Sequence, residues 1–220
     1  MTEARRRHPW IRRLAALAAL GGLGAGPALP ACPPATTRHE TPHEGWCEDA
    51  AGARQGPIWG RRSDGSLRFL GTALDDAVHG AWRSWHPDGA PAIEAHYAHG
   101  VLTGPFRLWG ENGRLLYTGR HDALGRMDGR FERRWPDGTP RLRWEMRAGV
   151  HHGAIEGWYA SGARRVRGAR RDGRDSGDWS WWDEHGRLER RCRFEAGIAV
   201  AGPCRAPADA PARAAQAPPQ

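Results

Sequence analysis

The sequence predicts an all-β protein, an elongated antiparallel meander of about six stacked β-hairpins. Two observations carry this prediction: a glycine-started pattern recurs every 24 or 25 residues, and most copies contain an Asp-Gly or Asn-Gly turn pair between two alternating segments. The stretch from Gly104 to Gly129 shows the pattern, with Phe106 two residues and Trp109 five residues after the first glycine. The repeats start at positions 56, 80, 104, 129, 153 and 177, and a residual seventh starts at 202.

Each repeat is expected to fold as one β-hairpin. The turn pairs, such as Asp88-Gly89 and Asn112-Gly113, are expected to supply the positive-φ residues of a two-residue turn. If the starting glycine is position zero, the turn lies between positions eight and nine, and position two faces position fifteen. A large residue then mostly faces a small one, as cross-strand packing favours. The pairs are Ile58–Gly71, Trp82–Ala95, Phe106–Gly119, Ile155–Gly168 and Trp179–Cys192, with Phe131–Trp144 as the large–large exception.

Position two is apolar in every repeat and is predicted to be the structural column. Strand alternation puts it on one face together with positions four, thirteen, fifteen and seventeen. Each such side chain contributes roughly 1.5–3 kcal/mol when buried, so an uninterrupted apolar column is expected to form the core. The structural residues are Trp82, Phe106, Phe131, Ile155 and Trp179, together with the starting glycines Gly80, Gly104, Gly129, Gly153 and Gly177.

Position five carries the candidate ligand residues and is predicted on the opposite face, among charged neighbours. One interpretation is stacking on sugar, aromatic or proline-rich ligands, with Arg134 held between Trp109 and Trp158 by cation–π attraction. The other is structural: these side chains pack along the sheet, or a bulge near Arg83-Ser84 and its equivalents turns them inward. The candidate ligand face consists of Trp85, Trp109, Arg134, Trp158 and Trp182.

These residues resemble the MORN repeat, whose core reads roughly YxGxxxxGxxxGxGxxxxxDG. The best match is Tyr117, Gly119, Gly125, Gly129 and Asp137-Gly138. The tryptophan-bearing form of 24 residues is similar to a bacterial variant labelled YwqK-type toxin–antitoxin antitoxin. The resemblance covers about residues 56–204 and implies an antiparallel array used for binding and scaffolding, without catalytic residues. Several repeats lack the Tyr-x-Gly step, so ligand preferences do not carry over.

The N-terminal segment, residues 1–31, is predicted to be a secretory signal. An arginine-rich start precedes the apolar stretch 14–23, which is too short to span a membrane permanently. Residues 29–32 (LPAC) resemble a bacterial lipobox, which predicts that Cys32 is lipidated; ordinary cleavage near 26–28 (GPA) is the alternative. The remaining divisions are a disordered tether at 32–45, the repeat domain at 46–204 and a disordered Ala/Pro-rich tail at 205–220. The repeat domain is expected to open with a half-repeat cap, in which Trp46 and Cys47 have positions fourteen and fifteen of a missing preceding repeat.

The charge of the chain argues against a nucleic-acid partner. All 33 basic residues are arginine, and the formal net charge is +8. Loss of residues 1–31 removes five arginines and one glutamate, which leaves about +4. A mildly basic exported protein has little reason to meet nucleic acid.

The four cysteines are expected to form disulfides, because an exported chain meets an oxidising environment and no CxxC pair exists. Cys192 and Cys204 are predicted to bond and to staple the last hairpin; the alternative is that both are small buried residues. Cys47 stays unpaired if Cys32 is lipidated and can pair with Cys32 if it is not.

No catalytic or metal-binding constellation stands out. The sequence lacks a GxSxG elbow, a phosphate-binding loop and an HExxH motif. His96 and His99, and the pair His151-His152, point in divergent directions, so no metal or other cofactor is expected. The prediction is therefore a non-catalytic, exported, lipid-anchored protein-binding or scaffold module of the bacterial cell envelope, with an unknown protein or envelope ligand as partner. Two alternatives stay open: binding of cell-envelope glycan through exposed tryptophans, and an antitoxin-like partner of a toxin.

Overall fold

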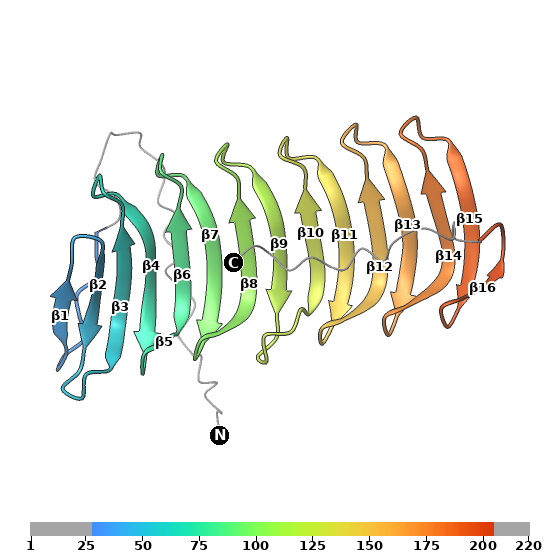
Figure 1. Ribbon diagram of the computed structural model, residues 1–220. Coiled ribbons are helices and arrows are strands. Elements are labelled where there is room, and N and C mark those ends of the chain that lie inside the picture. The colour runs from blue at the N-terminus through green and yellow to red at the C-terminus, as the bar shows by residue number, and fades with distance from the viewer. Residues whose placement is uncertain (1–27, 205–220) are drawn as a thin grey trace, which may run out of the picture.

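The protein is one open antiparallel sheet. The computed structural model describes residues 28–204, and within this range the regular structure consists of sixteen strands and no helix. Each strand pairs with the next along the chain, except that the short β5 and then β6 both pair with β4 (Figure 1). The predicted all-β meander of hairpins is confirmed. The strands are β1 (Thr37–Glu40), β2 (Glu44–Glu48), β3 (Arg54–Arg61), β4 (Leu67–Leu74), β5 (Ala77–Val78), β6 (Gly80–Trp85), β7 (Pro91–Ala98), β8 (Val101–Trp109), β9 (Leu115–His121), β10 (Gly129–Arg134), β11 (Pro140–Arg147), β12 (Val150–Trp158), β13 (Arg164–Arg171), β14 (Arg174–Trp182), β15 (Leu188–Glu195) and β16 (Ile198–Ala201).

The register within each repeat is the predicted one. Position two and position fifteen are direct cross-strand partners in all six hairpins. These pairs lie on one face, which is lined by aromatic and aliphatic side chains. At its centre Phe131 is fully buried and stacks on Trp144, with 5.5 Å between ring centroids, and Met146, Tyr117 and Leu142 pack around them. The apolar face is therefore the core of a sheet that has a single layer over the described residues.

The small residue at position fifteen makes room for a ring from the next repeat. A Cβ built on Gly119 would lie 2.1 Å from the ring of Phe131, which is closer than any real carbon contact. Glycine is therefore required at this position because the following ring lies flat against its backbone. The same contact joins Trp82 to Gly71 and Trp179 to Gly168.

The junction between Trp144 and Ile155 reverses this order of sizes. These two residues are direct partners on neighbouring strands β11 and β12. Here the large ring belongs to position fifteen and the smaller aliphatic side chain to position two. The junction is still filled by one large and one smaller residue. Trp144 can therefore be large although it also faces Phe131 within its own hairpin, which explains the large–large exception.

The turns inside the repeats differ from the prediction. At His86–Ala90 the His86 carbonyl accepts from the Gly89 N–H at 3.0 Å, and the His86 N–H donates to the Ala90 carbonyl at 2.8 Å, which makes a three-residue loop. Only Gly89 has positive φ, at 85°, while the Asp88 carboxylate accepts from the Ala90 N–H. The turn aspartate thus acts through its side chain rather than through a left-handed backbone.

Two-residue turns with two positive φ values occur instead between the repeats. His99-Gly100, with φ of 47° and 81°, joins β7 to β8, and Ala148-Gly149, with 48° and 85°, joins β11 to β12. The starting glycines have positive φ as well, from 65° at Gly104 to 111° at Gly153, and lie where the strand register shifts. A side chain other than glycine would be strained at these bulges.

The N-terminal end of the sheet begins earlier than predicted. Residues 32–45 were expected to be a disordered tether, but β1 and the start of β2 lie within them. Trp46 pairs with Ile58 as Trp144 pairs with Ile155, so Trp46 rather than Cys47 has position fifteen. This difference of one residue turns Cys47 to the other face, where it is fully buried.

Both ends of the sheet carry a disulfide. Cys32 is bonded to Cys47, with 5.6 Å between Cα atoms. A lipid thioether would need the same Cys32 sulfur, so the predicted lipidation is incompatible with this bond, and the alternative pairing holds. The structure also contains the Cys192–Cys204 bond that the spacing predicts. The predicted signal segment, up to residue 27, and the tail from residue 205 lie outside the described residues.

Candidate binding face

The face opposite the aromatic column is a lattice of arginine and glutamate side chains. On β7, Glu94 lies between Arg83 and Arg107, with nitrogen–oxygen distances of 3.8 Å and 3.2 Å. These three residues are direct cross-strand partners on β6, β7 and β8. Alternation of opposite charges across neighbouring strands therefore holds the long side chains in fixed order.

The lattice continues across the middle of the sheet. Glu132 contacts Arg134 at 2.8 Å and Arg143 at 3.1 Å, and one carboxylate thus holds two guanidinium groups. Farther along, Glu156 lies within 3.8 Å of Arg164 and 3.9 Å of Arg167. Solvent-exposed pairs such as Arg107–Glu94 contribute about 0–1 kcal/mol each to stability, whereas the Glu132 side chain is only 15% exposed. The exposed pairs consequently do little for the fold, and their charges remain available to a partner.

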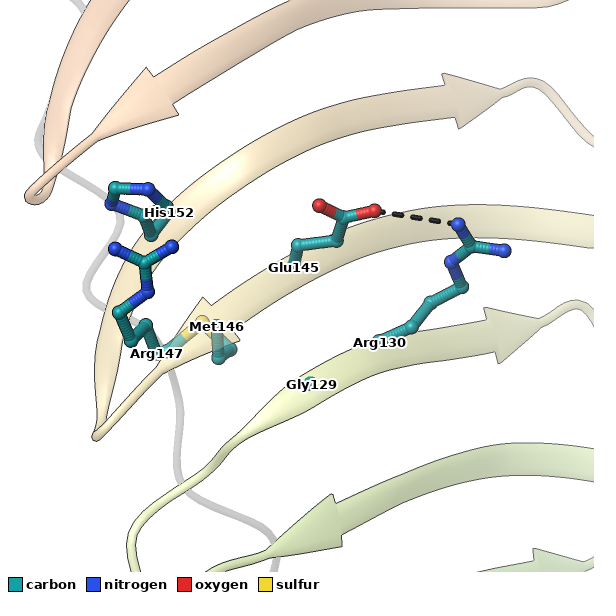
Figure 2. Close-up of a pocket in the computed structure, with 6 residues that line it drawn as sticks. All are labelled: Gly129, Arg130, Glu145, Met146, Arg147 and His152. Atoms are coloured by element: carbon teal, nitrogen blue, oxygen red, sulfur yellow. Dashed lines mark hydrogen bonds and ion pairs between the residues drawn. The ribbon is translucent and has the colours of Figure 1, made fainter.

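Shallow hollows open between β10, β11 and β12 on this part of the molecule. In Figure 2 Arg130 and Glu145 reach toward each other across two neighbouring strands, 3.4 Å apart, while His152 and Arg147 lie by the turn. A side chain at Gly153 would collide with the Glu145 carboxylate, so that glycine leaves room for the ion pair. The adjoining hollow is lined by Arg130, Glu132, Arg143, Trp144, Glu145, Ala154 and Glu156.

Two of the predicted ligand tryptophans lie on this charged face. The guanidinium of Arg143 lies 5.1 Å from the Trp158 ring centroid, and that of Arg164 lies 5.8 Å from Trp182. Both arginines also contact glutamates of the lattice, which places the rings on the same side. A register shift accompanies position five in every repeat, but at Trp158 and Trp182 it does not turn the ring into the core.

All four predicted tryptophans are partly buried. The backbones of three of them, Trp85, Trp109 and Trp182, are also held in place. In each case a side chain of the preceding repeat forms a hydrogen bond with the carbonyl group of the tryptophan. His86 Nε2 lies 3.0 Å from the Trp109 carbonyl, and the Tyr159 hydroxyl donates to the Trp182 carbonyl at 2.8 Å. Arg62 makes the equivalent bond to the Trp85 carbonyl. Arg62, His86 and Tyr159 all have position six of their repeats, so the side chain at this position links the turn of each of these repeats to the turn of the next repeat.

The predicted position of Arg134 between Trp109 and Trp158 is wrong. Arg134 bonds Glu132 at 2.8 Å and the Gly138 carbonyl at 3.3 Å. Arg143 lies over Trp158 instead, because β11 is the direct neighbour of β12 whereas β10 is one strand farther away.

A second row of contacts, which the repeat pattern did not reveal, joins the turns between repeats. At three of the six starting glycines, the preceding residue accepts from a backbone N–H of the turn twenty residues later. All six residues at this position can form hydrogen bonds (Gln, His, Thr, Asp, His, Ser), which is a sequence signal for this row. The contacts are His99 N–H to His79, Ala148 N–H to Asp128 and Asp172 N–H to His152, at 3.4, 3.0 and 3.4 Å.

Titratable groups with displaced pKa values lie away from the charged lattice. Burial raises the pKa of Tyr117 to about 12 and lowers the pKa of His121, whose ring contacts Phe106 and Phe131. Burial, helped by the charge of Arg170, also lowers the pKa of His151. These shifts follow from packing on the apolar face rather than from a reaction centre.

The histidines singled out by sequence do not converge. His96 lies 3.3 Å from the Thr103 hydroxyl, and His99 packs edge-on against His79 with ring centroids 4.8 Å apart. Over residues 28–204 no group of three or more histidine, cysteine or acidic side chains is arranged to hold a metal ion. The same part of the chain also lacks a helix with the length and hydropathy needed to cross a membrane.

Comparison with known proteins adds no family assignment. A scan against protein-family models finds no match, and a search of curated proteins finds none.

Proposed function

We propose that this chain is an exported, non-catalytic binding or scaffold protein that presents the charged face of its sheet to a protein ligand. The observation that carries the proposal is the ordered lattice, in which Glu94, Glu132 and Glu156 each contact two arginines, at least one of them on a neighbouring strand. Such a surface offers both charges at fixed spacing over many strands. The resemblance to MORN repeats, used for binding and scaffolding, supports the same assignment.

The experiment compares two arginines on opposite faces. Arg143 belongs to the lattice, whereas Arg133 pairs with Leu142 and Tyr117 on the apolar side. The oxidised protein is cross-linked in native envelope extract, and bound proteins are quantified for the parent, Arg143→Gln and Arg133→Gln. Loss of the same bound protein in Arg143→Gln alone supports the proposal. Equal capture by all three would overturn the assignment of this face.

Export is supported by the two cysteine pairs, since disulfides persist in oxidising compartments. Mass spectrometry of the native protein under non-reducing conditions tests it directly. A peptide in which Cys32 is linked to Cys47 is expected. An acylated Cys32, or four free thiols, would contradict this form of the protein.

Binding of cell-envelope glycan is a second candidate, favoured by Trp158 and Trp182 on the charged face. A sugar ring stacked on Trp158 would have to share or displace the Arg143 guanidinium. Titration with purified envelope glycan, read by tryptophan fluorescence, distinguishes the two candidates. Saturable quenching that disappears in Trp158→Ala supports glycan binding, and no change in fluorescence leaves the protein ligand as the proposal.

A further inference from the structure

An open sheet has two edge strands, and here they are β1 and β16. The outer N–H and C=O groups of an edge strand lack partners in their own sheet, so another strand can add to them. Proteins commonly protect such edges with charged side chains. The two edges of this sheet differ in this respect.

Strand β1 is protected by charge. Its sequence is Thr-Arg-His-Glu, and Glu40 contacts Arg38 at 3.1 Å and Arg61 at 3.9 Å. His39 lies 3.9 Å from Glu48 on the neighbouring strand. A strand added at this edge would meet a row of charged side chains already engaged with one another.

Strand β16 has no such protection. Its sequence is Ile-Ala-Val-Ala, and Ile198 and Val200 are 70% and 50% exposed. Large aliphatic side chains with high strand propensity on an uncharged edge favour strand pairing. Among the strands of residues 28–204, no other contains two large aliphatic side chains that are as exposed as these.

The chain that follows β16 turns away from its outer edge. Gly202 has positive φ, at 89°, and its Cα lies so close to β15 that a Cβ there would be 2.2 Å from the Arg191 carbonyl oxygen. The Cys192–Cys204 bond then fixes residues 202–204 on β15. Within the described part of the chain, the outer side of β16 therefore remains uncovered.

We infer that β16 pairs with β16 of a second copy of this chain and forms a two-fold dimer. In antiparallel pairing centred on Ala199, Ile198 lies opposite Val200 of the other copy, and Val200 lies opposite its Ile198. The same two side chains are thus buried twice, as an isologous interface requires. The charges on β1 oppose head-to-tail addition, so association stops at the dimer.

The dimer has a consequence for binding. Antiparallel pairing of two equal edges requires a two-fold axis perpendicular to the sheet, which keeps both charged faces on the same side. A ligand with two copies of its epitope would meet two lattices at once, and its apparent affinity would rise through effective concentration.

Sedimentation of the oxidised full-length protein over a wide concentration range tests the inference. The parent is expected to show a monomer–dimer equilibrium. Ile198→Lys places two like charges in the interface and is expected to raise the dimer dissociation constant about tenfold or more. The matched control is Val101→Lys, since Val101 has the same place in an inner repeat and is 42% exposed; it is expected to leave the equilibrium unchanged.

Hydrogen exchange locates the contact. The amides of Ile198–Ala201 are expected to become more protected as the parent concentration rises, but not in Ile198→Lys, whose melting temperature should stay within a few degrees of the parent. A parent that is monomeric throughout, or a series of larger oligomers, would overturn the inference. So would protection of these amides that appears only when a different protein is added.

Discussion

The two faces of this sheet are built on different physical principles. On the apolar face, a ring from one repeat lies flat on a glycine of the repeat before it, as Phe131 does on Gly119. On the charged face, exposed arginines and glutamates pair across strands. Apolar burial is worth several times more than an exposed ion pair. Over the middle repeats, the comparison therefore teaches that one face sets the stability, while the other can change its exposed residues and its ligand without endangering the fold.

The largest expected effect is removal of a buried ring. Phe131→Ala leaves a cavity against Gly119 and Trp144 and is expected to lower the free energy of unfolding by about 3–5 kcal/mol. Urea unfolding followed by tryptophan fluorescence measures it. Loss of less than 1 kcal/mol would mean that the apolar face does not carry the stability.

A smaller loss is expected when the glycine under the ring gains a methyl group. Gly119→Ala forces Phe131 away and is expected to cost about 1–3 kcal/mol through overpacking. The double variant Gly119→Ala/Phe131→Ala tests the contact itself, because the methyl group then enters the vacated space. The two losses should be clearly less than additive, and strict additivity would show that the residues do not interact.

The next effect is a pH dependence that belongs to the apolar face alone. Burial lowers the pKa of His121, against a weaker opposing effect of the Asp122 charge. Above the ordinary histidine pKa of about 6.5 both states are neutral, and below it the unfolded chain takes up protons more readily than the folded one. Stability is therefore expected to fall as the pH drops from 7 to 5. His121→Phe should flatten this dependence, with His151 responsible for what remains.

The smallest effect is expected on the charged face. Trp158→Ala removes a partly buried ring and its cation–π contact with Arg143, for which roughly 0.5–1 kcal/mol is expected beyond the lost packing. Its melting temperature should stay far closer to the parent than that of Phe131→Ala. If the two variants melt alike, position five belongs to the core and the distinction between the faces fails.

Sequence periodicity predicted the strands and their register because both depend on local rules. A fixed repeat length and strict alternation leave one pairing in which Phe106 meets Gly119, and that pairing is present. Turn type was harder to predict, because an Asp-Gly pair such as Asp88-Gly89 suits both two-residue and three-residue loops. The loop that forms depends on a register shift between Ser84 and Trp85, at the base of the turn. The one-residue error at Cys47 arose because the first hairpin has no starting glycine to set the count.

The contacts of the candidate site were less accessible to sequence. The linear pattern gives Arg134 and Trp158 the same repeat position, five, and only the strand order shows that the contact to Trp158 comes from Arg143. The disulfide between Cys32 and Cys47 depends on how the segment before β1 crosses the sheet. No repeat pattern covers that segment, so its path could not be predicted.

The interlock of ring and glycine also bears on how such a chain can change length during evolution. A duplicated unit beginning at Gly104 would bring its own ring, Phe106, and its own glycine, Gly119, and would fit between its neighbours without other changes. At Trp144 and Ile155 the sizes are reversed, so a unit inserted there would press a large ring against Trp144. Duplication of a repeat should thus be tolerated at most junctions and selected against at this one. The array is therefore expected to keep the repeats of Phe131 and Ile155 next to each other when its length changes.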